Sequence, residues 1–168
     1  MGGSIVYKNI LFCTDFSNDA HMAFVHALDL SRKYRAKLYL LHIISSQNPC
    51  STSSETSHTP VSSEEPSDES ERQMQQQALK AMIKQYVNEL DEQDDYDIQV
   101  RTGSPDIKII QFARQFQIDM IVLGAQGRPE KDRRIFIHTA ANVSKFAPCQ
   151  VIAIRSPRNQ GTDTETAL

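Results

Sequence analysis

Hydrophobic and polar residues follow two alternating patterns along this chain. Short apolar runs have the length of buried strands, and one segment alternates apolar and polar residues like a strand near a sheet edge. These segments predict strands at 7–13, 38–44, 96–101, 120–123 and 150–154. Between them, apolar residues recur three and four positions apart, which predicts amphipathic helices. The helices are expected to begin near residues 18, 71, 105 and 138.

The order of these elements is strand, helix, strand, repeated until a fifth strand is reached. Regular alternation of this kind predicts an α/β fold with a parallel, doubly wound sheet. The connections should be right-handed crossovers, which place helices on both faces of the sheet.

The helical spacing also predicts which residues face the core. In the second helix the expected core residues are Leu79, Met82, Ile83, Tyr86, Val87 and Leu90. The third helix should begin at Ser104-Pro105, with serine as the cap and proline in the first turn. Its expected core residues are Ile107, Ile110, Ala113 and Phe116.

Two segments lack the apolar residues that a packed element needs. Residues 45–72 are rich in Ser, Thr, Glu and Pro, so we expect a flexible loop there. The polar residues from Ser156 onward are expected to form a disordered tail over 157–168. The remaining chain, 1–156, is expected to form a single domain interrupted by the loop.

Composition narrows the function. The 168 residues are 39% hydrophobic and 23% charged, as in a soluble domain, and the net charge of -3 argues against a nucleic-acid binder. No apolar run reaches the roughly 18–20 residues that span a membrane, and no secretory signal is recognisable. Cys13, Cys50 and Cys149 are too far apart in sequence for a CxxC pair, so no zinc or disulfide framework is expected. A reducing, cytoplasmic setting fits best.

The strongest candidate for a binding site is the segment Gly124-Ala125-Gln126-Gly127, directly after the apolar run 121–123. Glycine tolerates positive φ and lets the backbone approach a ligand closely. Free backbone N–H groups in such a turn, and at the start of the next helix, can bind an anion. Nucleotides bind at this end of the strands in many α/β proteins.

Four separated blocks of sequence resemble one known family. They are Ile10 to Ser17, Leu40 to Ile43, Ile118 to Arg128 and Ala147 to Val151, and they occur in the family's order. Together they resemble the universal stress protein family over about residues 5–155.

The resemblance implies a sheet of strand order 3-2-1-4-5 in a cytoplasmic, often dimeric protein that binds ATP or AMP, with Mg²⁺ only alongside ATP. Asp15 would contact the nucleoside, although it could equally cap the first helix. A backbone contact near the end of strand two is expected at Ile43. The full set of nucleotide-binding residues that we expect is Thr14, Asp15, Ile43, Gly124, Gly127, Arg128, His138 and Thr139.

The sequence departs from the family's phosphate motif, Gly-x-x-Gly followed after nine residues by Gly and Ser or Thr. Gly124 and Gly127 are present, but Ile137 and His138 stand at the second half of the motif. A β-branched side chain in place of glycine blocks close backbone approach. Three nearby cations, with His138 as a cap of the last helix, could compensate. These cations are Lys131, Arg133 and Arg134.

Two functions remain open from the sequence. The first is a regulatory module that binds an adenine nucleotide. The second is a dimeric interaction protein that has lost the phosphate site. In both, a homodimer is expected through the last strand, at Val151, Ile152, Ala153 and Ile154. No catalytic constellation is recognisable, so we do not expect an enzyme, and a slow ATPase is the weakest alternative.

Overall fold

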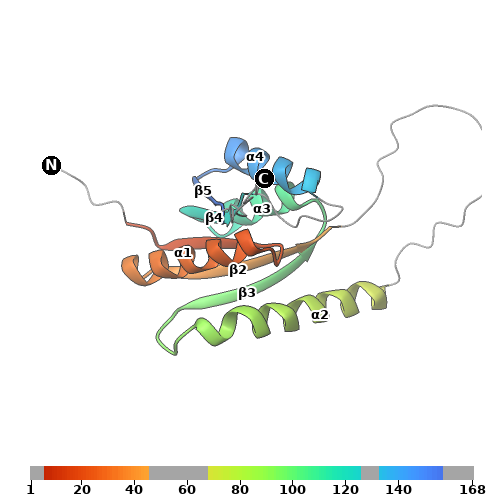
Figure 1. Cartoon of the computed structure of the whole chain (residues 1–168), viewed down its shortest axis with the longest axis horizontal. Helices are drawn as coiled ribbons and strands as arrows, with labels where there is room; N and C mark the ends of the chain where they lie inside the picture. Colours follow the sequence, from red (N-terminus) through yellow and green to blue (C-terminus); the bar gives the residue numbers. More distant parts are fainter. Residues whose placement is uncertain (1–5, 46–67, 126–132, 157–168) are drawn as a thin grey trace, which may run out of the picture.

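A computed structural model describes residues 6–45, 68–125 and 133–156 (Figure 1). In chain order the elements are β1 (Asn9–Thr14), α1 (Asn18–Tyr34), β2 (Lys37–Ile44), α2 (Asp68–Tyr86), the 3-10 helix η1 (Val87–Glu89), β3 (Tyr96–Thr102), α3 (Pro105–Gln115), β4 (Met120–Gly124), α4 (Arg133–Phe146) and β5 (Gln150–Ile154).

The five strands form one parallel sheet of order β3-β2-β1-β4-β5, as predicted. β1 lies in the centre, and its neighbours run in the same direction on both sides. Cys13 near its end is paired with Leu41 on β2 and Leu123 on β4. The chain therefore changes winding direction between β1 and β4, and the carboxyl ends of three strands meet there.

Alternate residues of each central strand serve two separate cores. Ile10 and Phe12 pack beneath α1 and α2, whereas Leu11 and Cys13 pack beneath α3 and α4. The two helix pairs thus cover opposite faces of the sheet (Figure 1). A strand buried on both faces needs apolar residues at every position, which explains the continuous apolar runs.

The second helix corrects two predictions. α2 begins at Asp68, so the loop expected to reach residue 72 ends sooner, and residues 46–67 lie outside the described parts. Met82 and Tyr86 are fully buried as predicted, but Leu79 and Ile83 are 38% and 45% exposed. α2 packs mainly against β2 and β3, and Tyr86 at its end reaches Phe12 and Thr14 on β1, so only part of the helix surface is buried.

The third helix begins as predicted, with Ser104 at the N-cap and Pro105 in the first turn. Its core face was predicted only in part: Ala113 is buried and Phe116 packs against the core as predicted, but Ile107 is 53% exposed. The buried residues are Pro105, Ile109, Phe112 and Ala113. The helix carries two overlapping sets of apolar residues at helical spacing, and only packing against the sheet selects between them.

The start of α4 and the segment after β5 also differ from prediction. α4 begins at Arg133, five residues before the expected start at His138, so Arg133 and Arg134 belong to the helix and not to a loop. Ser156 is hydrogen-bonded to Asp19 and is therefore anchored, while 157–168 lie outside the described residues. Within the parts of the chain that are described, no helix is long and apolar enough to cross a membrane.

Candidate functional site

A small cavity lies at the carboxyl ends of β1, β2 and β4. The sheet forms one side of it, and the start of α3 and the second turn of α4 form the other. This is the point where the sheet changes winding direction, the usual ligand position in open α/β sheets. The cavity is lined by Cys13, Thr14, Asp15, Leu41, Ile43, Pro105, Ile109, Leu123, Gly124 and Thr139. Five of the eight predicted site residues are therefore brought together: Thr14, Asp15, Ile43, Gly124 and Thr139.

Asp15 uses its two carboxylate oxygens differently. Oδ1 accepts hydrogen bonds from the Ser17 N–H at 3.0 Å and from the Ser17 hydroxyl at 2.6 Å. Ser17 is the N-cap of α1 and accepts in turn from the Ala20 N–H at 3.1 Å. Asp15 thus orients the capping residue and is not itself the cap. Its Oδ2 is buried and has no hydrogen-bond partner among the described residues.

A buried carboxylate oxygen without a partner is costly, so such an atom in a native structure calls for an explanation. Asp15 borders the cavity, and Oδ2 is the one of its two oxygens that has acceptor capacity to spare. A ligand hydroxyl or amino group in the cleft would satisfy it.

The turn that presents Asp15 is held by strained backbone. Phe16 adopts a φ of 62°, which is rare for a bulky side chain. Its N–H donates to Thr14 Oγ1 at 2.9 Å, and its ring packs against His42 at 4.6 Å between centroids. His42 Nδ1 donates to the Thr14 carbonyl at 2.8 Å, which fixes its tautomer. These contacts determine where the Asp15 carboxylate points.

The hydroxyl of Thr14, which lines the cavity, already has a hydrogen-bond partner elsewhere. Thr14 Oγ1 lies 2.6 Å from the hydroxyl of Tyr86, a fully buried residue at the end of α2. That hydrogen bond is on the α2 side of the sheet, away from the cavity. A direct contact of the Thr14 side chain with a ligand therefore stays a prediction.

The remaining cavity wall is apolar. Leu41, Ile43, Ile109 and Leu123 are all less than 9% exposed. Burial, with a smaller contribution from Cys149, raises the pKa of the Cys13 thiol far above its ordinary range, so Cys13 behaves as a neutral, apolar side chain. The space enclosed is about 40 Å³, room for a water molecule or two and well below a nucleotide-sized pocket. A nucleoside therefore needs the cleft to widen, or lies across its mouth.

The structure shows a packing reason for glycine at position 124 that the sequence did not reveal. It is the last residue of β4 and does not have the positive φ expected of it. A Cβ at this position would lie 2.9 Å from the Ala20 nitrogen and 3.0 Å from Asp19 atoms. Gly124 is required because the first turn of α1 crosses directly over it. The glycine permits close packing of helix on strand, and a role in ligand approach remains a prediction.

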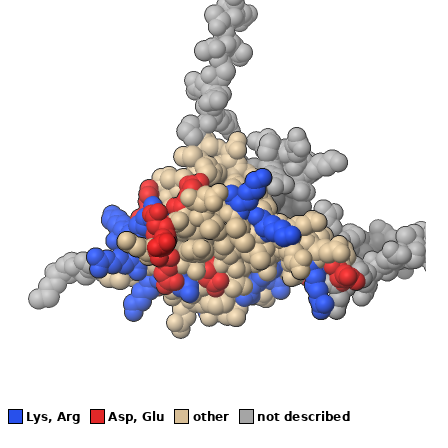
Figure 2. Space-filling model, turned by 90° about the horizontal axis from the view of Figure 1, so that it is seen from below, with Lys and Arg blue, Asp and Glu red and all other residues tan. Residues whose placement is uncertain are grey.

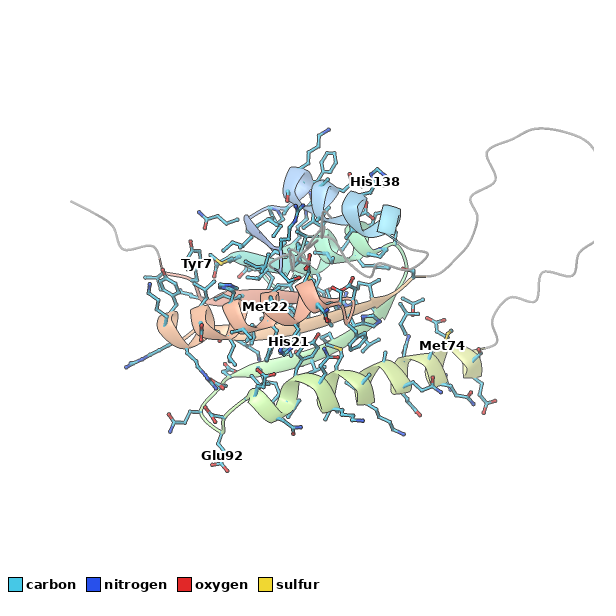
Figure 3. The ribbon with its side chains drawn as sticks, in the orientation of Figure 1. Tyr7, His21, Met22, Met74, Glu92 and His138 are labelled. Carbon is cyan, nitrogen blue, oxygen red and sulfur yellow. The ribbon has the colours of Figure 1, made fainter. Side chains whose placement is uncertain are left out.

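The last part of the predicted site lies around α4. Thr139 is 7% exposed and lines the cavity, as expected. His138 lies within α4 and points away from the sheet into solvent (Figure 3), so it does not cap the helix. Gly127, Arg128 and Lys131 lie outside the described residues. No cluster of three metal-binding side chains occurs in the described ranges.

Sequence reasoning missed several residues that shape the site. Cys13 and Leu41 each lie two positions before a predicted site residue, on the same face of the same strand, and this spacing could have identified them. Tyr86 and Ser156 carry no local signal, because their partners Thr14 and Asp19 are 72 and 137 residues away.

The architecture and the cleft can be compared with known proteins. The family model described as the universal stress protein family matches residues 6–155. The chain belongs to the universal stress protein family. A curated relative, a universal stress protein of Methanocaldococcus jannaschii, is 25% identical over 162 residues, covering 94% of this chain and 88% of the relative.

Solved structures of the family have the same fold. The universal stress protein UspA from Lactobacillus plantarum has a TM-score of 0.65 and 26% identity, covering 90% of this chain and all of the other. A family protein from Arabidopsis thaliana with AMP bound has a TM-score of 0.55 and 20% identity, with 94% and 97% coverage. A universal stress protein from Archaeoglobus fulgidus in complex with dAMP has a TM-score of 0.58 and 18% identity, with 89% and 99% coverage.

Proposed function

We propose that this universal stress protein is a regulatory module that binds an adenine nucleotide at the carboxyl ends of β1, β2 and β4. The observation that carries the proposal is Asp15 Oδ2, a buried acceptor without a partner among the described residues. Solved family members with AMP and dAMP support the ligand class. Binding would favour one conformation of the chain and so signal to a protein partner.

Within this proposal each end of the ligand has different support. The nucleoside end would place a hydroxyl or amino group against Asp15 Oδ2, with Ile43 and Ile109 forming an apolar wall beside the base or sugar. The phosphate end would fall toward Gly127 and Arg128, outside the described residues. We therefore propose AMP or ATP, with Mg²⁺ accompanying only ATP, in a cytoplasmic homodimer formed through β5.

Isothermal titration with adenosine, AMP and ATP, with and without Mg²⁺, tests the proposal. Asp15→Asn replaces an accepting carboxylate by an amide, and a hydrogen bond to a charged group contributes about 1.5–3 kcal/mol. Affinity for all three ligands should fall roughly ten- to hundred-fold. Asp29→Asn, an exposed carboxylate on α1, is the matched control and should bind like the wild type.

A second candidate function is favoured by the cavity's small volume of about 40 Å³. A cleft closed by its own side chains would suit an interaction protein that no longer takes a nucleotide. The same titration separates the two, because this candidate requires that no ligand binds at millimolar concentration.

A further inference from the structure

The outer edge of β3 is open along its length in the described part of the chain. β3 is hydrogen-bonded to β2 on one side, and no described strand lies on its other side. It spans seven residues, six of them partly buried. An edge strand of this length presents unpaired backbone donors and acceptors that can bind another strand.

The hydrogen bonds to β2 show which residues face that edge. The Leu38 N–H donates to the Asp95 carbonyl at 2.8 Å, and the Gly103 N–H donates to the Ile44 carbonyl at 2.9 Å. In a parallel ladder the N–H and C=O of one residue point to the same neighbour, and successive residues alternate. Since Asp95 and Gly103 face β2, the even-numbered residues Tyr96, Ile98, Val100 and Thr102 direct their backbone groups outward.

Exposed apolar side chains of α2 lie in the helix layer beside this edge. Leu79 shares a surface hollow of about 270 Å³ with Ile98 and Val100, so this side of α2 lies beside the edge strand. Ile83 follows Leu79 by one turn, and both are more than a third exposed. Seen from below, this side of the molecule carries Lys and Arg as well as Asp and Glu side chains, with uncharged residues between them (Figure 2). Leu79 and Ile83 therefore place an apolar patch beside the open edge, although Arg72, Gln75 and Gln76 line the same hollow.

The sequence of β3 is complementary to itself when two copies run antiparallel about Gln99. All seven residues then find a partner, and Asp97 of one copy lies opposite Arg101 of the other, twice. Opposite charges at facing positions stabilise strand pairs. Ile98 lies opposite Val100 as a hydrogen-bonded pair, which the outward direction of both backbones requires.

The existing contacts of Arg101 are compatible with this arrangement. Its guanidinium lies 4.9 Å from the centre of the Phe112 ring and donates to Gln115 Oε1 at 3.2 Å, on the α3 face of the sheet. Asp97 and Gln99 are odd-numbered like Arg101 and lie on that same face. The charged pair and the central glutamines would thus share one face, and the Leu79 and Ile83 side chains the other.

We propose that two copies of this chain associate through β3, antiparallel and two-fold symmetric about Gln99, so that the two sheets become one. Leu79 and Ile83 of the two α2 helices then approach each other across the same axis, which covers their exposed surface. A two-fold interface of this kind is closed and self-complementary. β5 forms the opposite edge of the sheet, so this contact is independent of any association there.

Disulfide trapping tests the register. In a background with Cys50→Ser and Cys149→Ser, which leaves the buried Cys13, Gln99→Cys places two thiols in a facing pair that is not hydrogen-bonded. Its Cα atoms would be about 4.5 Å apart, within disulfide range. In Asp97→Cys the two thiols would be roughly 13 Å apart along the strands. Mild oxidation should link Gln99→Cys and leave Asp97→Cys unlinked; equal linkage of the two, or none in either, overturns the proposal.

A charge exchange tests the same interface without cysteines. Asp97→Arg and Arg101→Asp each convert two attractive pairs into repulsive ones and should weaken self-association by about ten-fold in sedimentation velocity. The double variant exchanges the charges, restores complementarity and should recover association, which a folding defect would not. If the native chain and all three variants self-associate to the same extent, β3 takes no part in the association and the proposal fails. The edge would then be free for an extended peptide of another protein.

Discussion

Asp19, in the first turn of α1, accepts hydrogen bonds from both the backbone N–H and the hydroxyl of Ser156, which follows β5. The N–H contact is 2.9 Å long, and Asp19 is only 6% exposed. This buried carboxylate links the start of the first helix to the end of the last strand. It also lies beside Gly124, a residue that lines the cleft.

Removing that carboxylate should destabilise the whole domain. Asp19→Ala leaves the Ser156 donors without their acceptor, which should lower the free energy of unfolding by about 1–3 kcal/mol. Urea denaturation measures the change. Asp29→Ala, an exposed carboxylate on the same helix, should change stability by less than about 0.5 kcal/mol. Equal effects of the two variants would show that the Asp19 contact contributes nothing specific.

Gly124→Ala should lower the stability of the folded chain even when no nucleotide is present. The added methyl group would press on the backbone of Asp19 and Ala20, and overpacking of this kind typically costs about 1–3 kcal/mol. Thermal unfolding without any nucleotide gives the result. A variant as stable as the wild type that fails to bind nucleotide would show instead that the glycine serves the ligand.

The buried hydrogen bond between Tyr86 and Thr14 should be measurable on its own. Tyr86→Phe keeps the ring packed against Phe12 and Phe24 but removes the hydroxyl that lies 2.6 Å from Thr14 Oγ1. We expect a loss of about 1–2 kcal/mol in chemical denaturation. Tyr96→Phe, at a tyrosine that is 37% exposed, is the control and should be neutral. A neutral Tyr86→Phe would contradict the assigned hydrogen bond.

How far the sequence predicts this structure depends on how local each signal is. The strands were predictable because central strands buried on both faces need an apolar residue at every position, as in 120–123. The cleft was predictable because Asp15, Ile43 and Gly124 each lie within one residue of the end of a strand, and parallel strands end at one edge. These inferences need only neighbouring residues.

Helix faces were harder to predict, because periodicity shows that a helix has an apolar side but not how wide a surface will cover it. Leu79 and Ile83 lie outside the covered stripe of α2, and on α3 Ile109 is buried whereas Ile107 is exposed. Tertiary hydrogen bonds such as Asp19 with Ser156 were out of reach, since neither residue has a neighbour in sequence that indicates the other. Gly124 looked like a turn glycine until the crossing helix was visible.

Acid should weaken one contact at the opposite end of the sheet. The Arg32 guanidinium donates to both oxygens of Asp94, at 3.0 and 2.7 Å, and holds the pKa of that carboxyl below its ordinary value. A lowered pKa in the folded state adds stability above the ordinary pKa and loses it as the pH falls. Arg32→Gln should raise the pKa of Asp94 in a carboxyl NMR titration, whereas Arg35→Gln should leave it unchanged. An unshifted Asp94 in Arg32→Gln would refute the pairing.

The most direct test of the nucleotide site is a crystal structure of the chain grown with saturating AMP. The account predicts a nucleoside hydroxyl or amino group within about 2.6–3.2 Å of Asp15 Oδ2, with Oδ1 still bonded to Ser17. It also predicts a cleft wider than the present 40 Å³ or so. Crystals that contain no nucleotide at saturation, or nucleotide that leaves Asp15 Oδ2 without a partner, would contradict the central claim.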